Sequence, residues 1–177
     1  EAAIKLARKW GKTQKQGAYE IIAAEQSFHG RTMGALSATA QSKYQADFEP
    51  LVPGFKTVKF GDFEAVKKSI SSQTAAIMLE PIQGEGGVVP APDGYLESVA
   101  QLCEKENILL ILDEVQTGFG RTGKMFAFQH HGIRPDILTL AKALGSGVPI
   151  GAMLVGSKAA QIFAPGDHAS TFGGNPL

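Results

Sequence analysis

The sequence predicts an α/β fold with a mostly parallel sheet flanked by helices. Short apolar runs alternate along the chain with segments whose apolar residues recur at helical spacing, which is typical of strand–helix units. The run at 108–112 consists of five consecutive Ile and Leu residues, the pattern of a strand covered on both faces. The chain has 177 residues, of which 44% are hydrophobic and 19% charged, so one domain with a sizeable core is possible.

Six apolar runs are expected to form the strands of this sheet. They are 19–24, 57–60, 75–79, 108–112, 137–140 and 152–155. The run at 57–60 is the weakest of them. The runs at 137–140 and 152–155 resemble 108–112 in composition, so we expect these two strands to be covered on both faces as well.

The first helix is predicted over residues 1–10. Ile4, Ala7 and Trp10 lie on one stripe of this segment, and basic residues occupy the opposite side. Gly11 follows the last apolar residue of the stripe, and glycine is a common helix stop. We therefore expect this helix to end at Gly11.

Three further helices are expected later in the chain. Asp62 and Asp93 each precede an apolar stripe and are predicted to be N-caps, because a carboxylate can accept the unpaired N–H groups of a first turn. A short helix is also predicted over 157–163. The stripes that follow the two caps are Phe63, Val66 and Ile70, and Leu96, Val99 and Leu102.

Composition excludes several classes of protein. The 17 basic and 17 acidic residues cancel, which argues against a nucleic-acid binder that needs clustered positive charge. No stretch of about 20 residues is apolar enough to span a bilayer. A single cysteine, Cys103, rules out a disulfide framework and a zinc site built on paired thiolates. We expect Cys103 to be a buried, reduced thiol, and we predict no metal site.

Glycine is the unusual component. The 21 glycines make up about 12% of the 177 residues, against an average near 7%. They gather at 84–87, 118–123, 145–151 and 173–174. Glycine clusters of this kind indicate backbone held in tight turns near a ligand.

The residues that follow the predicted strands carry the chemistry. Ligands of open α/β sheets bind outside the carboxyl ends of the strands. Asp113 and Glu114 come directly after 108–112, Lys142 comes just after 137–140, and the segment 28–31 (Phe-His-Gly-Arg) follows 19–24. An acid, a lysine, an aromatic ring and an arginine should therefore converge at one edge of the sheet.

Lys142 is the most informative of these residues. It is the only charged side chain between Asp136 and Lys158, and we expect it to be desolvated, which would lower its pKa and make its amine nucleophilic. A nucleophilic lysine paired with a buried acid, here Asp113, suits pyridoxal phosphate, whose ring nitrogen needs a negative partner. The alternatives are a lysine that extends to solvent and an aspartate that caps a loop.

Residues 109–114 also match the magnesium-binding strand of a nucleoside triphosphatase, since an apolar strand that ends in acids can hold magnesium. This enzyme class also requires a phosphate loop with a glycine five positions before a Gly-Lys-Ser/Thr sequence. The single candidate, Gly11-Lys12-Thr13, follows a predicted helix rather than a strand, and Leu6 stands where the first glycine should be. We therefore reject this interpretation.

Five ordered motifs carry a resemblance that covers essentially the whole chain. They are SFHGRT at 27–32, LEPIQGEGG at 79–87, LDEVQTG at 112–118, AKAL at 141–144 and STFGGNP at 170–176. Together they resemble the class III, fold-type-I aminotransferases that use pyridoxal 5'-phosphate. The segments 34–39 and 147–154 are most similar to the acetylornithine and succinylornithine branch of that family.

The resemblance implies a cofactor site. Lys142 would hold the cofactor covalently and move the substrate proton, while Asp113 would pair with the pyridinium nitrogen. Gln116 would lie near the phenolic oxygen of the ring, and Phe28 would stack on the ring face. Thr171 would bind the cofactor phosphate of a neighbouring subunit, which implies a homodimer with shared active sites.

The resemblance also implies substrate contacts. Arg31 would bind the substrate α-carboxylate through its planar guanidinium. Glu85 would act as a gate that pairs with an arginine outside this chain until 2-oxoglutarate binds. Glu80 would be structural or would support the residues that contact the ligands, and His29 would flank the ring and need not do acid–base work.

The expected reaction is transamination of N2-acetylornithine with 2-oxoglutarate, giving N-acetylglutamate semialdehyde and glutamate in cytoplasmic arginine biosynthesis. Ornithine, succinylornithine and 4-aminobutyrate aminotransferases remain alternatives, as does a non-catalytic interaction segment with the same fold. Residues 1–177 would form the central part of the large, cofactor-binding domain. The upstream phosphate-binding loop and the C-terminal small domain would lie outside it, so we expect these residues alone to be inactive.

Overall fold

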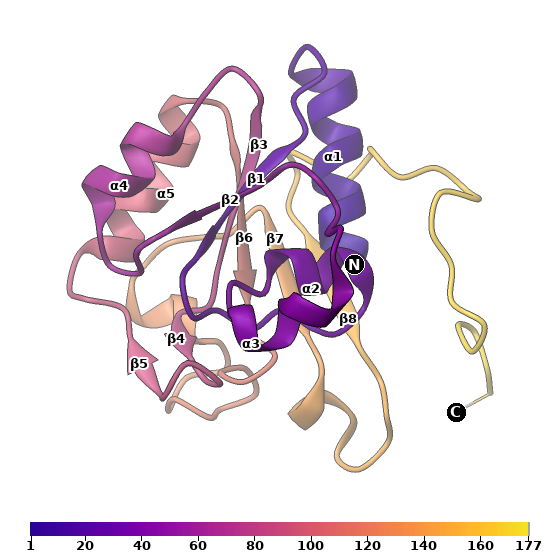
Figure 1. Ribbon diagram of the computed structural model, residues 1–177. Coiled ribbons are helices and arrows are strands. Elements are labelled where there is room, and N and C mark those ends of the chain that lie inside the picture. The colour runs from indigo at the N-terminus through magenta and orange to yellow at the C-terminus, as the bar shows by residue number, and fades with distance from the viewer. Residues whose placement is uncertain (177) are drawn as a thin grey trace.

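The computed structural model describes residues 1–176, and its centre is a six-stranded sheet (Figure 1). The strand order is β2-β1-β3-β6-β7-β8, and all pairs are parallel except β7 with β8, which are antiparallel. This confirms the predicted α/β class with a mostly parallel sheet. The strands are β1 (Glu20–Ala24), β2 (Phe55–Val58), β3 (Thr74–Leu79), β6 (Leu109–Asp113), β7 (Ile137–Leu140) and β8 (Ala152–Val155).

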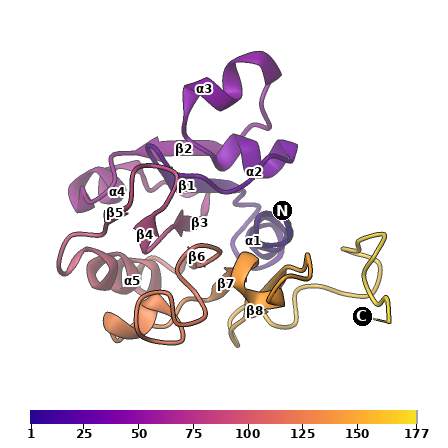
Figure 2. The same cartoon turned by 90° about the horizontal axis from the view of Figure 1, so that it is seen from below.

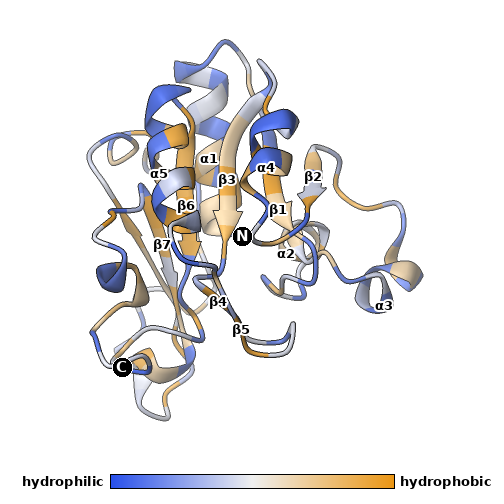
Figure 3. Cartoon of the chain, turned by 90° about the vertical axis from the view of Figure 1, so that its left-hand side faces the viewer, coloured by the Kyte–Doolittle hydropathy of each residue, from blue (hydrophilic) through white to orange (hydrophobic). Residues whose placement is uncertain are grey.

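Helices cover both faces of the sheet. Helix α1 (Ala2–Gln14) lies on one face, and α4 (Phe63–Ser69) and α5 (Tyr95–Lys105) lie together on the other (Figures 1 and 2). Each face has its own apolar cluster, one between the sheet and α1 and one between the sheet and the α4–α5 layer. Figure 3 shows the apolar strands between helices whose outer surfaces are hydrophilic. Burial on both faces explains why β3 and β6 have no exposed residue.

Smaller elements gather at the carboxyl edge of the sheet. Helices α2 (Met33–Ala38) and α3 (Ser42–Gln45), with a 3-10 turn at Ala46–Phe48, follow β1. The hairpin of β4 (Ile82–Gln83) and β5 (Val89–Pro90) follows β3. Two more 3-10 turns, Ala127–His130 and Lys142–Gly145, follow β6 and β7. These short elements were not predicted, because none of them is longer than six residues and an apolar pattern has too little length in which to recur.

The predicted end of the first helix at Gly11 was wrong. The helix continues to Gln14, and Gly11 is buried within it. A Cβ atom on Gly11 would lie 2.0 Å from the carbonyl oxygen of Ala18. Glycine is therefore required at this position for close approach of the following loop, and the helix does not stop there.

The two predicted caps have different outcomes. Asp62 caps α4 as expected, because its carboxylate accepts a hydrogen bond from the Ala65 N–H at 2.9 Å. Asp93 does not cap α5. The N-cap position is Gly94, which has a φ of +74° and no side chain to accept a bond. The predicted helix at 157–163 was also wrong, since that segment forms turns and a bend and contains no helix.

Strand β8 was correctly bounded, but the prediction that it is covered on both faces was wrong. Ala152 and Leu154 are exposed, whereas Met153 and Val155 pack on the α1 side of the sheet. The reason is position: β8 is the last strand in the sheet order, and the α4–α5 layer lies over the strands at the middle and the far side of the sheet (Figure 2). No helix among residues 1–176 has the length and hydropathy to cross a membrane.

Candidate functional site

A pocket of about 100 Å³ lies at the carboxyl edge of the sheet, where the loops after four parallel strands meet. This is where an open α/β sheet is expected to bind its ligand. We call it the edge pocket. Its lining residues are Phe28, His29, Gly30, Glu80, Glu85, Asp113, Val115, Gln116 and Lys142. Five residues singled out in the sequence therefore line one cavity: Phe28, Glu85, Asp113, Gln116 and Lys142.

Asp113 is the fixed acid of the edge pocket. It is the last residue of β6, is only 6% exposed, and lies 2.8 Å from Nδ1 of His29 through its Oδ2 atom. Its other oxygen accepts a hydrogen bond from the Val115 N–H at 3.1 Å. These two contacts hold the carboxylate in one orientation in the lining of the pocket.

His29 was expected to flank the ring, but its pairing with Asp113 was not predicted, because nothing in a sequence separation of 84 positions indicates it. Its side chain is completely buried, and Nε2 has no hydrogen-bonding partner in the part of the chain that the structure describes. A buried polar atom without a partner costs about 1–3 kcal/mol, and a ligand group or a water in the pocket would remove that cost at His29.

Lys142 lines the edge pocket, but the expectation that it is desolvated was wrong, since its side chain is exposed. The reason is local: Lys142 opens the 3-10 turn Lys142–Gly145, none of whose residues is buried. Its φ of +42° is unusual for a residue with a side chain, and Ala141 before it has φ −162° and ψ −144°. Backbone strain of this kind clusters at functional sites, so Lys142 is marked by its conformation rather than by burial.

Glu80 follows β3 and is 4% exposed. Its carboxylate accepts hydrogen bonds from the N–H groups of Phe28, at 3.0 Å, and Gly84, at 3.2 Å. Burial raises the pKa of the Glu80 carboxyl above its usual value, while His29 and the two N–H donors act in the opposite direction. The prediction that Glu80 is structural agrees with these contacts.

Gln116 is held close to the loop that follows β3. A Cβ atom on Gly84 would lie 2.9 Å from Cγ of Gln116, so only glycine allows this side chain to lie against the turn. The Gly84–Gly87 turn also carries Glu85, which is exposed and lines the pocket. Clustered glycine in this segment therefore serves close packing around the edge pocket, as the composition predicted.

Arg31 and Thr171 do not line the edge pocket. The guanidinium of Arg31 is exposed and lies 5.3 Å from the ring centroid of Phe28 and 4.3 Å from that of Tyr44. Tyr44 itself packs edge-on against Phe28, and sequence analysis did not single it out. Thr171 is exposed in the C-terminal segment, which runs away from the sheet (Figure 1). Arg31 thus lies beside the pocket, whereas Thr171 lies apart from it within this chain.

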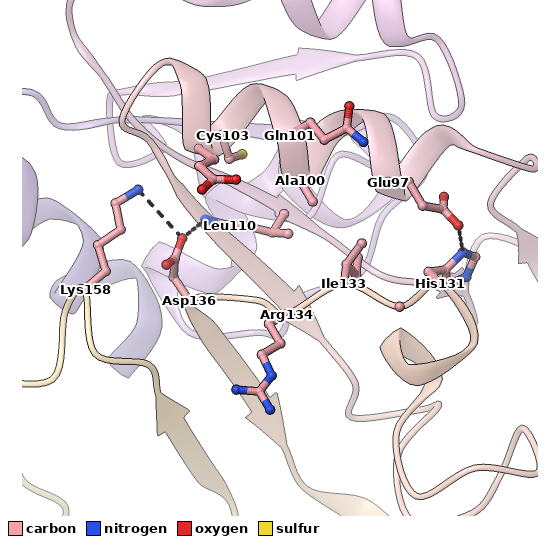
Figure 4. A pocket seen from close by; sticks show the side chains of 12 residues that line it. Glu97, Ala100, Gln101, Cys103, Leu110, His131, Ile133, Arg134, Asp136 and Lys158 are labelled. Atoms are coloured by element: carbon pink, nitrogen blue, oxygen red, sulfur yellow. Dashed lines mark hydrogen bonds and ion pairs between the residues drawn. The ribbon is translucent and has the colours of Figure 1, made fainter.

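A larger groove of about 510 Å³ lies beside α5, bordered by the segment from His131 to Asp136 and by Lys158; we call it the α5 groove. Two of its cations, Lys158 and His131, face acids. Lys158 lies 4.0 Å from Asp136, and His131 lies 3.0 Å from Glu97, with the two pairs at opposite ends of the groove (Figure 4). Cys103 also borders this groove, and burial raises its pKa to about 12. It is a free, buried thiol, as predicted.

Comparison with known proteins assigns the chain to a family. The model of the family described as aminotransferase class-III matches residues 1–177. The chain belongs to the class-III aminotransferases. This confirms the family that the sequence motifs resemble.

Individual class-III relatives agree with this assignment. The chain is 59% identical to the acetylornithine aminotransferase of Gloeobacter violaceus and 58% identical to that of Methanothermobacter thermautotrophicus, covering 100% and 99% of this chain. It spans 44% of the length of each. An ornithine aminotransferase structure from Toxoplasma gondii, reported with partial occupancy of PLP at its active site, is 40% identical with a TM-score of 0.94. That match covers 99% of this chain and 43% of the other.

Proposed function

We propose that the protein that carries this chain is a pyridoxal-phosphate-dependent aminotransferase that transfers the amino group of N2-acetylornithine to 2-oxoglutarate. The observation that carries the proposal is the convergence of Lys142 and Asp113 on one pocket at the carboxyl edge of the sheet. We further propose that residues 1–177 form the central part of a larger cofactor-binding domain, since they span less than half the length of the curated relatives.

The residues of the edge pocket fit the cofactor of this family. Its protonated ring nitrogen requires a buried negative partner, and Asp113 is a buried acid with a fixed orientation. Its aldehyde carbon requires an accessible amine, and Lys142 has no hydrogen-bonding partner among residues 1–176. The unpartnered Nε2 atom of His29 marks a place where a polar ligand group or a water would satisfy the site. When bound here, pyridoxal phosphate would supply the electron sink for breaking the Cα–H bond of an amino acid.

Lys142 and Asp113 would divide the chemistry between them. Lys142 Nζ would hold the cofactor covalently and then accept the proton that leaves the substrate Cα. Asp113 would keep a negative charge opposite the ring nitrogen, and His29 at 2.8 Å would keep that carboxylate from rotating away. Gln116 would donate a hydrogen bond toward the oxygen on the ring.

The loop after β1 would position the flat ring and the substrate. Phe28 would stack on the ring face, with Tyr44 supporting it edge-on at 5.7 Å between centroids. Arg31 would bind the α-carboxylate of the substrate. Its guanidinium already lies against both aromatic rings, which limits its freedom before a carboxylate binds.

Two further features belong to the same proposal. Glu85 would gate the access of 2-oxoglutarate from the turn after β3. Thr171 would reach a cofactor phosphate in a partner subunit, which is consistent with its exposure and its distance from the edge pocket of its own chain. A homodimer with shared sites and a cytoplasmic location follow from the family resemblance and are proposed with it.

The choice of amino donor is supported by the relatives. Proteins 53–59% identical to this chain are named acetylornithine aminotransferases, whereas the ornithine aminotransferase of Toxoplasma gondii is 40% identical. Ornithine is therefore the second candidate donor.

A panel of amino donors tests the proposed function. The full-length protein, loaded with pyridoxal phosphate, is assayed with 2-oxoglutarate and N2-acetylornithine, N2-succinylornithine, ornithine or 4-aminobutyrate. We expect kcat/KM to be highest for N2-acetylornithine. A higher kcat/KM for ornithine would replace the proposed amino donor and leave the proposed transamination standing. Absence of glutamate formation with every donor, despite bound cofactor, would favour the non-catalytic alternative.

A further inference from the structure

One buried carboxylate joins two loops of the edge pocket. Glu80 uses both of its oxygens: Oε2 accepts the hydrogen bond of the Phe28 N–H at 3.0 Å, and Oε1 accepts that of the Gly84 N–H at 3.2 Å. Phe28 is 52 positions earlier in the sequence, and Gly84 is four positions later. A single side chain therefore links the aromatic loop after β1 to the glycine-rich turn after β3.

The two linked loops carry different parts of the pocket. Phe28 and His29 belong to the first loop, and Glu85 belongs to the second. A second link joins the same regions at their base, where Nε2 of Gln83 donates to the carbonyl oxygen of Glu25 at 2.8 Å. Gln83 does not line the pocket, so among the described residues Glu80 is the link that lies at the cavity itself.

An acid at this position requires a reason, because burial of a carboxylate is unfavourable. Two N–H donors provide it. A carboxylate presents two acceptor oxygens, whereas the amide of glutamine presents one oxygen and one NH₂ donor. Glutamine here would place a donor against the N–H of either Phe28 or Gly84. Glutamate is the residue of this length that satisfies both donors.

We propose that Glu80 is a positioning residue that fixes the Phe28 loop and the Gly84–Gly87 turn relative to each other, and so sets the width of the edge pocket between Phe28 and Glu85. The effect of Glu80 on substrate binding rests on the proposed function. The link that Glu80 makes between the two loops does not, because its hydrogen bonds can be measured without any reaction.

Glu114 offers a matched control. It stands one residue after β6, is 1% exposed, and its carboxylate also accepts two backbone N–H bonds, from Ala127 at 2.7 Å and Phe128 at 2.9 Å. The loop that it holds does not line the edge pocket. Glu80→Gln and Glu114→Gln therefore make the same chemical change at two buried carboxylates, of which only Glu80 lines the cavity.

Hydrogen–deuterium exchange tests the link directly. In the full-length protein, Glu80→Gln should speed exchange at least about tenfold in peptides that contain the Phe28 or the Gly84 amide, since a lost bond leaves one of them unpaired. Glu114→Gln should speed exchange around 127–128 and leave 28 and 84 unchanged. If Glu80→Gln changes neither amide, or if both variants change the same peptides, the proposal is wrong.

Kinetics test the consequence. With the cofactor bound and its visible absorbance retained, Glu80→Gln should raise KM for 2-oxoglutarate or the amino donor at least about tenfold, while Glu114→Gln should leave KM unchanged in the folded protein. Glu80→Asp keeps two acceptor oxygens on a shorter side chain, so its KM should lie between those of Glu80→Gln and the wild type. This variant is the deciding test if Glu80→Gln does not fold. Altered exchange with unchanged KM would overturn the role in pocket width. A wild-type protein that fails to transaminate would instead refute the proposed function and leave the exchange result standing.

Discussion

The edge pocket and the α5 groove differ in how their charged groups are used. The groove is larger, about 510 Å³ against 100 Å³, yet Lys158 and His131 each face an acid there. In the smaller edge pocket, Lys142 has no partner among the described residues, and Nε2 of His29 is buried without one. The comparison shows that the volume of a pocket does not identify the reactive site. Buried polar atoms without a partner among the described residues occur at both places, Nε2 of His29 and Oε2 of Glu97, so the strained backbone of Lys142 marks the edge pocket better.

The largest expected effect concerns the two lysines. Lys142→Ala in the full-length protein should abolish transamination and the visible absorbance of the covalently bound cofactor, because no other described lysine lines the edge pocket. Lys158→Ala, in the α5 groove, should leave both unchanged. Absorbance and glutamate formation measure the two effects. A borohydride-reducible link between protein and cofactor that survives in Lys142→Ala would assign the attachment to another lysine.

The second effect compares two aspartates. Asp113→Asn removes the negative charge beside His29 but keeps the shape, so kcat should fall by orders of magnitude, each factor of ten corresponding to about 1.4 kcal/mol of barrier. Cofactor binding should fall less. Asp136→Asn in the α5 groove weakens the contact with Lys158 and the bond from the Leu110 N–H, so it should lower stability and leave kcat unchanged. Near-native kcat in Asp113→Asn would show that Asp113 has no electronic role.

The sequence was sufficient for features that depend on local pattern. All six strands were found within one or two residues, and the convergence of Asp113, Lys142 and Phe28 followed from the rule that carboxyl ends of parallel strands share an edge. The Asp62 cap could also be predicted from local sequence, because the cap and its N–H donor are three residues apart.

Features that depend on distant contacts could not be predicted. His29 pairs with Asp113, and Glu80 links Phe28 to Gly84. These residues lie on loops whose relative positions are set only when the sheet is assembled. The exposure of Lys142 depends on the turn that follows it, and the one-sided cover of β8 depends on its place at the edge. The roles of Arg31 and Thr171 came from the family resemblance, and they stay predictions.

A smaller effect concerns the pH dependence of stability at the edge pocket. Burial raises the pKa of Glu80 above its ordinary 4.5, so the folded protein holds this proton more tightly than the unfolded chain. Stability from this group is fully present below pH 4.5 and is lost as the pH rises through the folded pKa. Urea unfolding at several pH values should show wild-type stability falling relative to Glu80→Gln over that range. His29 and Asp113 face Glu80 and are common to both proteins. A constant difference across the range would show that Glu80 contributes no such term.

The smallest effect concerns Cys103 at the α5 groove. Burial raises the pKa of its thiol to about 12, so almost none of it is thiolate at neutral pH, and the thiolate is the form that reacts. Iodoacetamide at pH 8 should therefore modify Cys103 far more slowly in the folded protein than in urea, as mass spectrometry would measure. Cys103→Ala should lower the free energy of unfolding by about 1 kcal/mol and leave kcat and KM unchanged, since the groove carries none of the proposed chemistry. Rapid alkylation of the folded protein, or a loss of activity in Cys103→Ala with its stability retained, would contradict the separation of the α5 groove from the edge pocket.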